Sequence, residues 1–190
     1  MQSLIASIRL VIATMLICVV GYAAVIWSVG AIFTPWTAQG SLITDASGKV
    51  ISSQLIAQKF EQPKYFWPRP SSAGKEGYDA TSAAGSNKSP TSEELTERAK
   101  ELIERYGATP DRPLPPELAA ASGAGLDPHI SAHAALFQAQ RVAEARNLPQ
   151  PEIEKLIQQH AFSPGGFLTP DRLVNVLELN LALDKLASSR

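Results

Sequence analysis

Apolar residues form one long, uninterrupted run near the N-terminus. The run extends from Leu10 to Phe33 without Asp, Glu, Lys or Arg; Arg9 precedes it, and the next charged residue is Asp45. About 20 such residues span a hydrocarbon core of roughly 30 Å, and a single segment in lipid must be helical to satisfy its own backbone hydrogen bonds. The pattern therefore predicts a transmembrane helix, with Phe33 and Trp36 near its far interface.

Two other interpretations of this run remain open, namely a cleaved signal peptide and a buried helix of a soluble domain. The apolar part of a signal peptide usually has about 7–15 residues and ends at a small-residue cleavage site, so the longer run here favours an uncleaved anchor. Arg9 precedes the run and no Lys or Arg closely follows it. The positive-inside rule then predicts residues 1–9 in the cytoplasm, 10–33 across the cell inner membrane and 34–190 in the periplasm.

Beyond the apolar run, the hydrophobic segments become short. Two β-type runs, Ser41–Thr44 and Val50–Ser53, flank the turn-forming sequence Asp45–Lys49 and predict a hairpin. Residues 55–60 are expected to make a helical turn. Residues 71–91, rich in Ser, Gly, Ala and Asn, predict a long loop, and loops of this length in compact domains are usually functional or disordered.

Three consecutive aromatic residues, Tyr65, Phe66 and Trp67, lie in a segment with prolines on both sides, and Arg69 follows them. Because proline fixes φ and disfavours helix at the preceding residue, residues 63–71 are expected to be extended or turn-like. The aromatic side chains are then either a local plug in the core or part of a docking surface.

The next two segments have helical signals. Thr91 or Ser92 can cap a helix that stops at Gly107, whose lack of a Cβ suits the C-terminal position. Ser131 is a good N-cap for a second helix, and Asn147 can end it. Apolar residues recur at helical spacing in this second helix and predict a core-facing stripe: Ala135, Leu136, Ala139, Val142 and Ala143.

The C-terminal segment is ambiguous between strand and helix. Pro151 suits the first position of a helix running to about His160. Residues 173–179 are interpreted as a strand, with Asn180 capping a short final helix. One continuous helix starting at Thr169-Pro170 is an alternative that periodicity does not exclude. Together the elements indicate an α+β fold: one N-terminal transmembrane helix followed by a single mixed extracytoplasmic domain.

Composition narrows the possible functions. About 150 of the 190 residues follow the apolar run, which suits one domain with its own core. The formal net charge of -1 gives no strong field to attract nucleic acid. The only cysteine, Cys18, lies within the run, so the outer domain has neither a disulfide nor a thiol ligand.

The segment around residue 125 contains residue types that occur in catalytic and nucleotide sites. Gly123-x-Gly125-x-x-Pro128 departs from a dinucleotide loop because proline takes the third glycine position and no clear strand precedes it. Ser122, Asp127 and His129 include the types of a catalytic triad, but no G-x-S-x-G elbow accompanies them. A membrane-anchored periplasmic enzyme using these three residues remains the alternative function.

Other catalytic and metal-binding motifs are missing from the sequence. His129 and His133 have i, i+4 spacing, yet the Glu of an H-E-x-x-H zinc motif is absent. Neither a P-loop nor a D-K-T-G phosphorylation motif occurs. Capping and turn roles are the simpler interpretation of these residues.

Four stretches of the sequence are distinctive when taken together. They are Tyr65-Phe66-Trp67-Pro68-Arg69-Pro70-Ser71, Gly85-Ser86-Asn87, Ser122-Gly123-Ala124-Gly125-Leu126-Asp127-Pro128-His129-Ile130-Ser131, and Val174–Asp184. In these stretches the chain resembles the C subunit of the bacterial Kdp potassium-transporting P-type ATPase, and Gln140–Ala143 and Arg146 also fit this family. The resemblance covers nearly the whole chain in the right order. Small departures are Ala124, where a second Ser is common, and Lys88-Ser89-Pro90.

The resemblance implies a non-catalytic accessory subunit of an ATP-driven, high-affinity potassium import complex. Its expected partners are a channel-like potassium-translocating subunit, a P-type ATPase subunit, a small single-span peptide and membrane lipid. ATP and potassium are handled by the complex, and the resemblance implies no catalytic residue, cofactor or metal in this chain. Family members are described as catalytic chaperones that raise the ATP affinity of the ATPase subunit. A periplasmic domain cannot touch cytoplasmic ATP, so such an effect is expected to be indirect.

The matching stretches supply the candidate residues for defining shape or contacting partners. We expect the turn Ser122–His129 and the segment Tyr65–Pro70 to define the shape of the domain, and one of them to face the channel-like subunit. The candidates are Tyr65, Phe66, Trp67, Arg69, Gly85, Ser86, Asn87, Ser122, Gly123, Gly125, Leu126, Asp127, Pro128 and His129.

Overall fold

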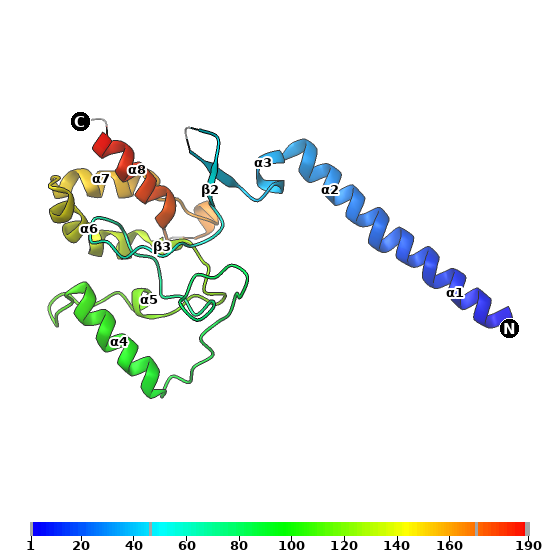
Figure 1. The fold of residues 1–190 in the computed structure, drawn as a ribbon, viewed down its shortest axis with the longest axis horizontal. Helices are drawn as coiled ribbons and strands as arrows, with labels where there is room; N and C mark the ends of the chain where they lie inside the picture. Colours follow the sequence, from blue (N-terminus) through cyan, green and yellow to red (C-terminus); the bar gives the residue numbers. More distant parts are fainter. Residues whose placement is uncertain (1, 46, 170, 189–190) are drawn as a thin grey trace. The chain divides into compact units, whose positions relative to one another are not determined.

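The structure is a computed structural model that describes residues 2–45, 47–169 and 171–188 (Figure 1). Ala46 of the predicted hairpin turn and Pro170 of the alternative helix start lie outside the described residues. Internal contacts divide the chain into two compact units, the first ending at Ser53 and the second beginning at Gln54. The mixture of helix and strand confirms the predicted α+β class.

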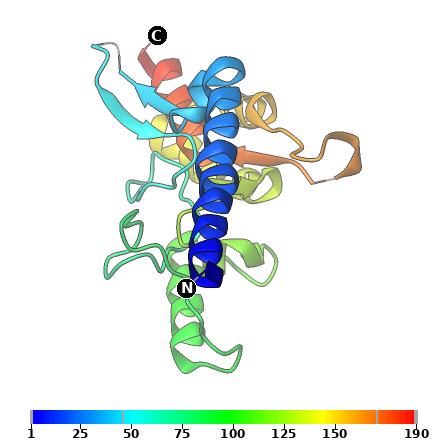
Figure 2. The ribbon, with the colours of Figure 1, turned by 90° about the vertical axis from the view of Figure 1, so that its right-hand side faces the viewer.

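One long helix dominates the first unit. It consists of α1 (Gln2–Met15), a π-helical segment η1 (Leu16–Gly21) and α2 (Tyr22–Phe33), which follow one another as a single coil (Figure 2). Its 32 residues are long and apolar enough to cross a membrane, and none of its described residues is buried. The helix begins eight residues before the apolar run and therefore includes Arg9. At 1.5 Å per residue it is about 48 Å long.

The rest of the first unit is a short helix and a hairpin. The helix α3 (Pro35–Ala38) precedes strands β1 (Leu42–Thr44) and β2 (Val50–Ser53), which pair antiparallel. The predicted hairpin is therefore confirmed. The Asp45 carboxylate accepts hydrogen bonds from the main chain of Ser47 (2.8 Å) and Lys49 (3.0 Å), which explains why this sequence turns here.

The second unit contains five α-helices and one short sheet within its described residues. The helices are α4 (Glu93–Tyr106), α5 (Pro116–Ala119), α6 (Ala132–Arg146), α7 (Gln150–His160) and α8 (Val176–Ser188), with a 3₁₀ turn η2 at Gly166–Leu168. Strands β3 (His129–Ser131) and β4 (Leu173–Asn175) pair antiparallel, with His129 opposite Asn175. Residues 71–91 contain no described helix or strand, as predicted.

Helices α6, α7 and α8 lie together in the second unit, apart from α4 (Figure 1). The core of the unit lies between these three helices, while no described residue of α4 is buried. The small residues on α6 let its neighbours approach closely. The buried cluster consists of Phe66, Leu118, Ile130, Ala134, Ala135, Ala139, Val142, Ala143, Ile153, Ile157, Val174, Val176, Leu179 and Leu183. Leu136, predicted to lie on this stripe, is only half-buried at its edge.

Most predicted helix ends are confirmed. Ser131 is the N-cap of α6, where its hydroxyl accepts from the Ala134 N–H at 3.0 Å. Asn147 and Gly107 end α6 and α4 in the left-handed region, at φ +53° and +61°. Pro151 takes the second position of α7 rather than the first, because the helix begins at Gln150.

Three expectations of local structure are wrong. The strand predicted over 173–179 ends at Asn175, and α8 begins at Val176, so Asn180 lies inside a helix instead of capping one. Asn175 is the capping residue, because its Oδ1 accepts from the Leu177 and Glu178 N–H groups at 3.1 and 3.2 Å. A continuous helix from residue 169 is also wrong, since β4 intervenes. Residues 55–60 are irregular rather than helical.

Candidate functional site

The segment carrying Phe66 and Trp67 runs extended between α6 and α8 without a neighbouring strand. Two buried amides replace that strand. Asn180 Oδ1 accepts from the Phe66 N–H (2.8 Å) and Asn180 Nδ2 donates to Phe66 O (3.0 Å). Gln138 Oε1 accepts from the Trp67 N–H (2.9 Å) and Gln138 Nε2 donates to Trp67 O (3.1 Å). Four buried backbone groups are thereby satisfied, as a sheet would satisfy them. We call Gln138 and Asn180 the amide pair.

Trp67 is held by cations as well as by the core. The guanidinium groups of Arg141 and Arg105 lie 3.6 and 4.1 Å from its ring centroid, and Tyr106 meets it edge-on at 5.1 Å. Arg141 also donates to the carbonyls of Pro63 and Tyr65. Burial lowers the pKa of Arg141 to about 10, so its positive charge persists at neutral pH. The structure therefore supports the core-plug interpretation for Phe66 and Trp67, both of which are buried.

Tyr65 has polar partners on α6 and α8. Its hydroxyl donates to Asp184 Oδ2 at 3.0 Å, and Arg146 forms a 2.7 Å ion pair with the other oxygen of the same carboxylate. Arg146 additionally donates to the Lys64 carbonyl through Nε. Tyr65 and Arg146 thus tie the start of the segment to the last two turns of α8.

Arg69 connects the aromatic segment to the glycine-rich turn. Its Nε and Nη2 donate to the carbonyls of Ala120 (3.3 Å) and Ala121 (3.1 Å), and its Nη1 lies 3.7 Å from Asp127 Oδ2. The other Asp127 oxygen accepts from the His129 backbone N–H and lies 3.0 Å from His129 Nδ1. These partners, the His129 side chain first, lower the pKa of Asp127 below its usual value, so the carboxylate is ionised at neutral pH.

The turn Ser122–His129 acts as a junction because its carbonyls accept hydrogen bonds from distant segments. The donors are the Ala84 N–H to Ala124 O (3.1 Å), the Ser71 hydroxyl to Gly125 O (2.5 Å), the Ala57 N–H to Leu126 O (2.9 Å) and the Val176 N–H to Pro128 O (2.9 Å). Four separate parts of the chain are therefore fixed against this turn.

Two of the matching glycines lie where a side chain would collide with backbone. Gly125 has φ +72°, and a Cβ there would lie 2.7 Å from Ala73 N and 2.9 Å from Ala84 O. A Cβ on Gly85 would lie 2.7 Å from Gly123 O. Gly123 itself faces open space. The structure thus brings the Gly85 region against the glycine-rich turn, with half-buried Ser86 next to it and Asn87 at φ +48°.

The residues of the alternative enzyme are not arranged as a triad. Ser122 is buried, and its hydroxyl accepts from the Asp127 backbone N–H at 3.4 Å. The His129 ring contacts Asp127 and packs edge-on against Phe162 at 5.5 Å. No contact described in the structure joins Ser122 to His129, whereas a triad needs that hydrogen bond to activate the nucleophile.

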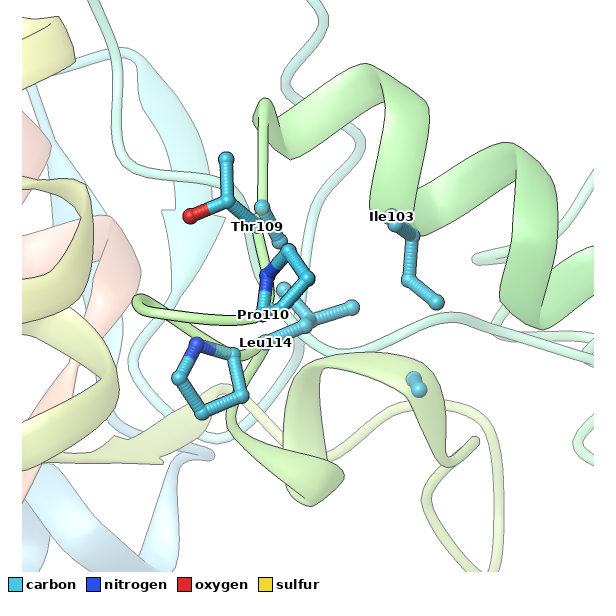
Figure 3. A pocket seen from close by; sticks show the side chains of 7 residues that line it. Ile103, Thr109, Pro110 and Leu114 are labelled. Atoms are coloured by element: carbon cyan, nitrogen blue, oxygen red, sulfur yellow. The ribbon is translucent and has the colours of Figure 1, made fainter.

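A separate apolar hollow of about 390 Å³ lies at the C-terminal end of α4, away from these motifs. Ile103 on α4 faces Pro110 and Leu114 in the following turn (Figure 3). None of the candidate residues lines it.

Sequence reasoning missed the amide pair and Tyr78. The Tyr78 hydroxyl donates to Arg69 O at 2.8 Å, and burial raises its pKa to about 12. A signal for Gln138 did exist, since it occupies the buried stripe of α6 between Ala135 and Val142, where a polar side chain must find a partner.

Comparison with known proteins identifies the family. A model of the KdpC family, "K+-transporting ATPase, c chain", matches residues 4–185. The chain is 63% identical over 189 residues to the potassium-transporting ATPase KdpC subunit of Parvibaculum lavamentivorans, covering 100% of both chains. The corresponding protein of Methylococcus capsulatus is 45% identical, with 90% of this chain and 91% of the other covered. That of Mycobacterium tuberculosis is 41% identical, with 97% and 99% covered. The chain therefore belongs to the KdpC family of K⁺-transporting ATPase c chains.

Proposed function

We propose that this chain is the accessory c subunit of a potassium-transporting P-type ATPase, and that it assembles and stabilises the pump without catalysing a reaction. The full-length match to relatives of that name carries the proposal. Within this chain, the stretches that carry the resemblance join separate segments of the domain. Arg69, Ser71 and Gly125 hold segments of the domain together. Such an arrangement supports a rigid docking body.

The proposed partners are the channel-like potassium-translocating subunit, the P-type ATPase subunit and the small single-span peptide. The long helix Gln2–Phe33 anchors the chain in the inner membrane with its N-terminus in the cytoplasm, and the second unit lies in the periplasm. In this topology the chain acts as a catalytic chaperone only indirectly, by favouring a pump state with higher ATP affinity. Such coupling requires a free-energy difference between pump states.

Assembly can be tested with two glycine variants of the same turn. Gly125→Val should weaken co-purification of the other pump subunits, because any Cβ at this position meets backbone atoms of residues 73 and 84. Gly123→Ala is the matched control, since its added methyl group enters open space. Equal recovery of the complex with both variants would contradict the role of the turn in assembly.

Topology can be tested with reporters fused after residue 190. If the second unit lies in the periplasm, a fusion to alkaline phosphatase should be active. A fusion to a fluorescent protein that folds only in the cytoplasm should not fluoresce. The opposite result would place the second unit in the cytoplasm, where direct contact with nucleotide becomes possible.

A further inference from the structure

Exposed apolar side chains cluster immediately after the long helix. Trp36, Leu42 and Val50 are 51%, 43% and 50% exposed. Thr44 pairs with Val50 across the hairpin, and Leu42 lies two residues before Thr44 on the same strand, so Leu42 and Val50 share one face of the sheet. The register shifts between Ile43 and Thr44, where β2 has Ile51 as an extra residue, and this bulge puts Ser52 on the opposite face from Val50. Within the first unit, the described residues leave this apolar face exposed.

Hydrogen bonds and close packing couple this face to the end of the helix. Helix α3 approaches α2 so closely that a Cβ on Gly30 would lie 3.4 Å from the Ala38 Cβ. Trp36 Nε1 donates to Leu42 O at 3.1 Å, and the Ser53 hydroxyl donates to Gly40 O at 2.7 Å. The hairpin is therefore attached to α3, and α3 is packed against the helix.

The connection is also short. Residues 34–41 separate the helix from β1, and eight extended residues reach about 27 Å at most. Half of them form α3, which rises only about 1.5 Å per residue. The headgroup layer occupies roughly 5–7 Å on each side of the hydrocarbon core. The hairpin must consequently lie close to the level at which the helix leaves the bilayer.

We propose that residues 35–53 form a lipid-binding segment that rests on the membrane crossed by the helix, with Trp36, Leu42 and Val50 in the boundary between headgroups and acyl chains. This inference depends on the membrane anchoring proposed above. Tryptophan favours that boundary because its ring is apolar and its N–H is polar. Lys49, exposed at the hairpin tip, supplies a cation for lipid phosphate, while main-chain donors hold the Asp45 carboxylate within the turn.

Spin labels on the full chain in lipid nanodiscs test this placement. The native Cys18 is exposed on the helix and gives a marker for the hydrocarbon core. Labels are then placed at Val50 and Leu42 in a Cys18→Ser background, and at Ser52, which pairs with Ile43 on the opposite face, as the matched control. Accessibility to oxygen relative to a water-soluble nickel reagent should be several-fold higher at Val50 and Leu42 than at Ser52.

Each other outcome overturns the inference in a distinguishable way. If the Cys18 label lies in lipid while those at Val50 and Leu42 are as exposed to nickel as Ser52, the helix is anchored and the hairpin stands in water. If Cys18 itself is exposed to water, the membrane anchoring fails as well. If Val50 becomes shielded from both reagents only when the other pump subunits are present, the occupant of this face is protein rather than lipid.

Discussion

Replacing Gly125 with alanine should destabilise the second unit by about 2–5 kcal/mol. A left-handed backbone costs a residue with a Cβ about 1–2 kcal/mol relative to glycine. The φ of +72° at Gly125 incurs that cost, and the new Cβ would lie 2.7 Å from Ala73 N and 2.9 Å from Ala84 O. Both contacts are with backbone, which cannot rotate away, so overpacking adds about 1–3 kcal/mol. The total is a large fraction of the roughly 5–15 kcal/mol that stabilises a typical domain.

Thermal unfolding of the full chain in detergent measures this loss. At about 2–4 °C per kcal/mol for a protein of this size, Gly125→Ala should lower Tm by roughly 5–20 °C. The control Gly123→Ala adds the same methyl group two residues away, in open space, and should change stability by no more than about 0.5 kcal/mol. If the two variants unfold at the same temperature, the close approach of residues 73 and 84 to the turn does not exist in solution.

Three further predictions concern Gln138, Asp127 and Tyr78. Gln138→Leu removes both partners of the buried Trp67 backbone and should cost about 2–4 kcal/mol in denaturant unfolding, whereas Gln159→Leu on the exposed side of α7 should be nearly neutral. Because the folded state lowers the pKa of Asp127, this carboxylate stabilises the protein above pH 3.8. The Tm difference between wild type and Asp127→Asn should therefore shrink as the pH falls below 3.8. A difference that stays constant would contradict the proposed ionic contacts of Asp127. Because burial raises the pKa of Tyr78 from 10.0 to about 12, the folded protein keeps this proton longer than the unfolded one and should lose up to about 2–3 kcal/mol as pH rises through that interval. Tyr78→Phe should show a smaller alkaline loss, and an unchanged pH profile would show that Tyr78 is not buried.

The elements that sequence predicted well are those defined by local chemistry. A hairpin forms where Asp45 can bond the main chain of its own turn, and α6 begins where the Ser131 hydroxyl reaches the Ala134 N–H. Each of these contacts spans four residues or fewer. Such signals are complete within a short window of sequence, so the predicted and observed boundaries agree.

The boundary at Asn175 combines a local cap, made by Asn175 Oδ1 with the Leu177 and Glu178 N–H groups, with contacts that a local pattern does not contain. β-Branched residues stand on both sides of it, at Val174 and Val176, and favour a strand by propensity. Two tertiary contacts help to fix where the strand ends: the Val176 N–H donates to the Pro128 carbonyl, and β4 pairs with β3. Tertiary contacts therefore override the propensity of the segment.

The candidate site likewise depends on both local and distant contacts. The local sequence singled out Phe66 and Trp67 as three adjacent aromatics with Tyr65, but the side chains that bind their backbone are 114 and 71 residues away. Polar residues at buried helix positions are the available signal, because a buried amide requires partners. That signal points to Gln138 and Asn180 without revealing which backbone groups they bind.

The amide pair also orders events during synthesis of the chain. Residues 65–71 leave the ribosome early, yet the amides that complete the Phe66 and Trp67 backbone belong to α6 and to α8, the last described helix. The Phe66 N–H and carbonyl therefore lack their partners until Asn180 has been synthesised, whereas Gln138 is available to Trp67 earlier. Closure over Phe66 joins the start of the second unit to α8, so a chain terminated before Asn180 would leave these two backbone groups without the amide that pairs them.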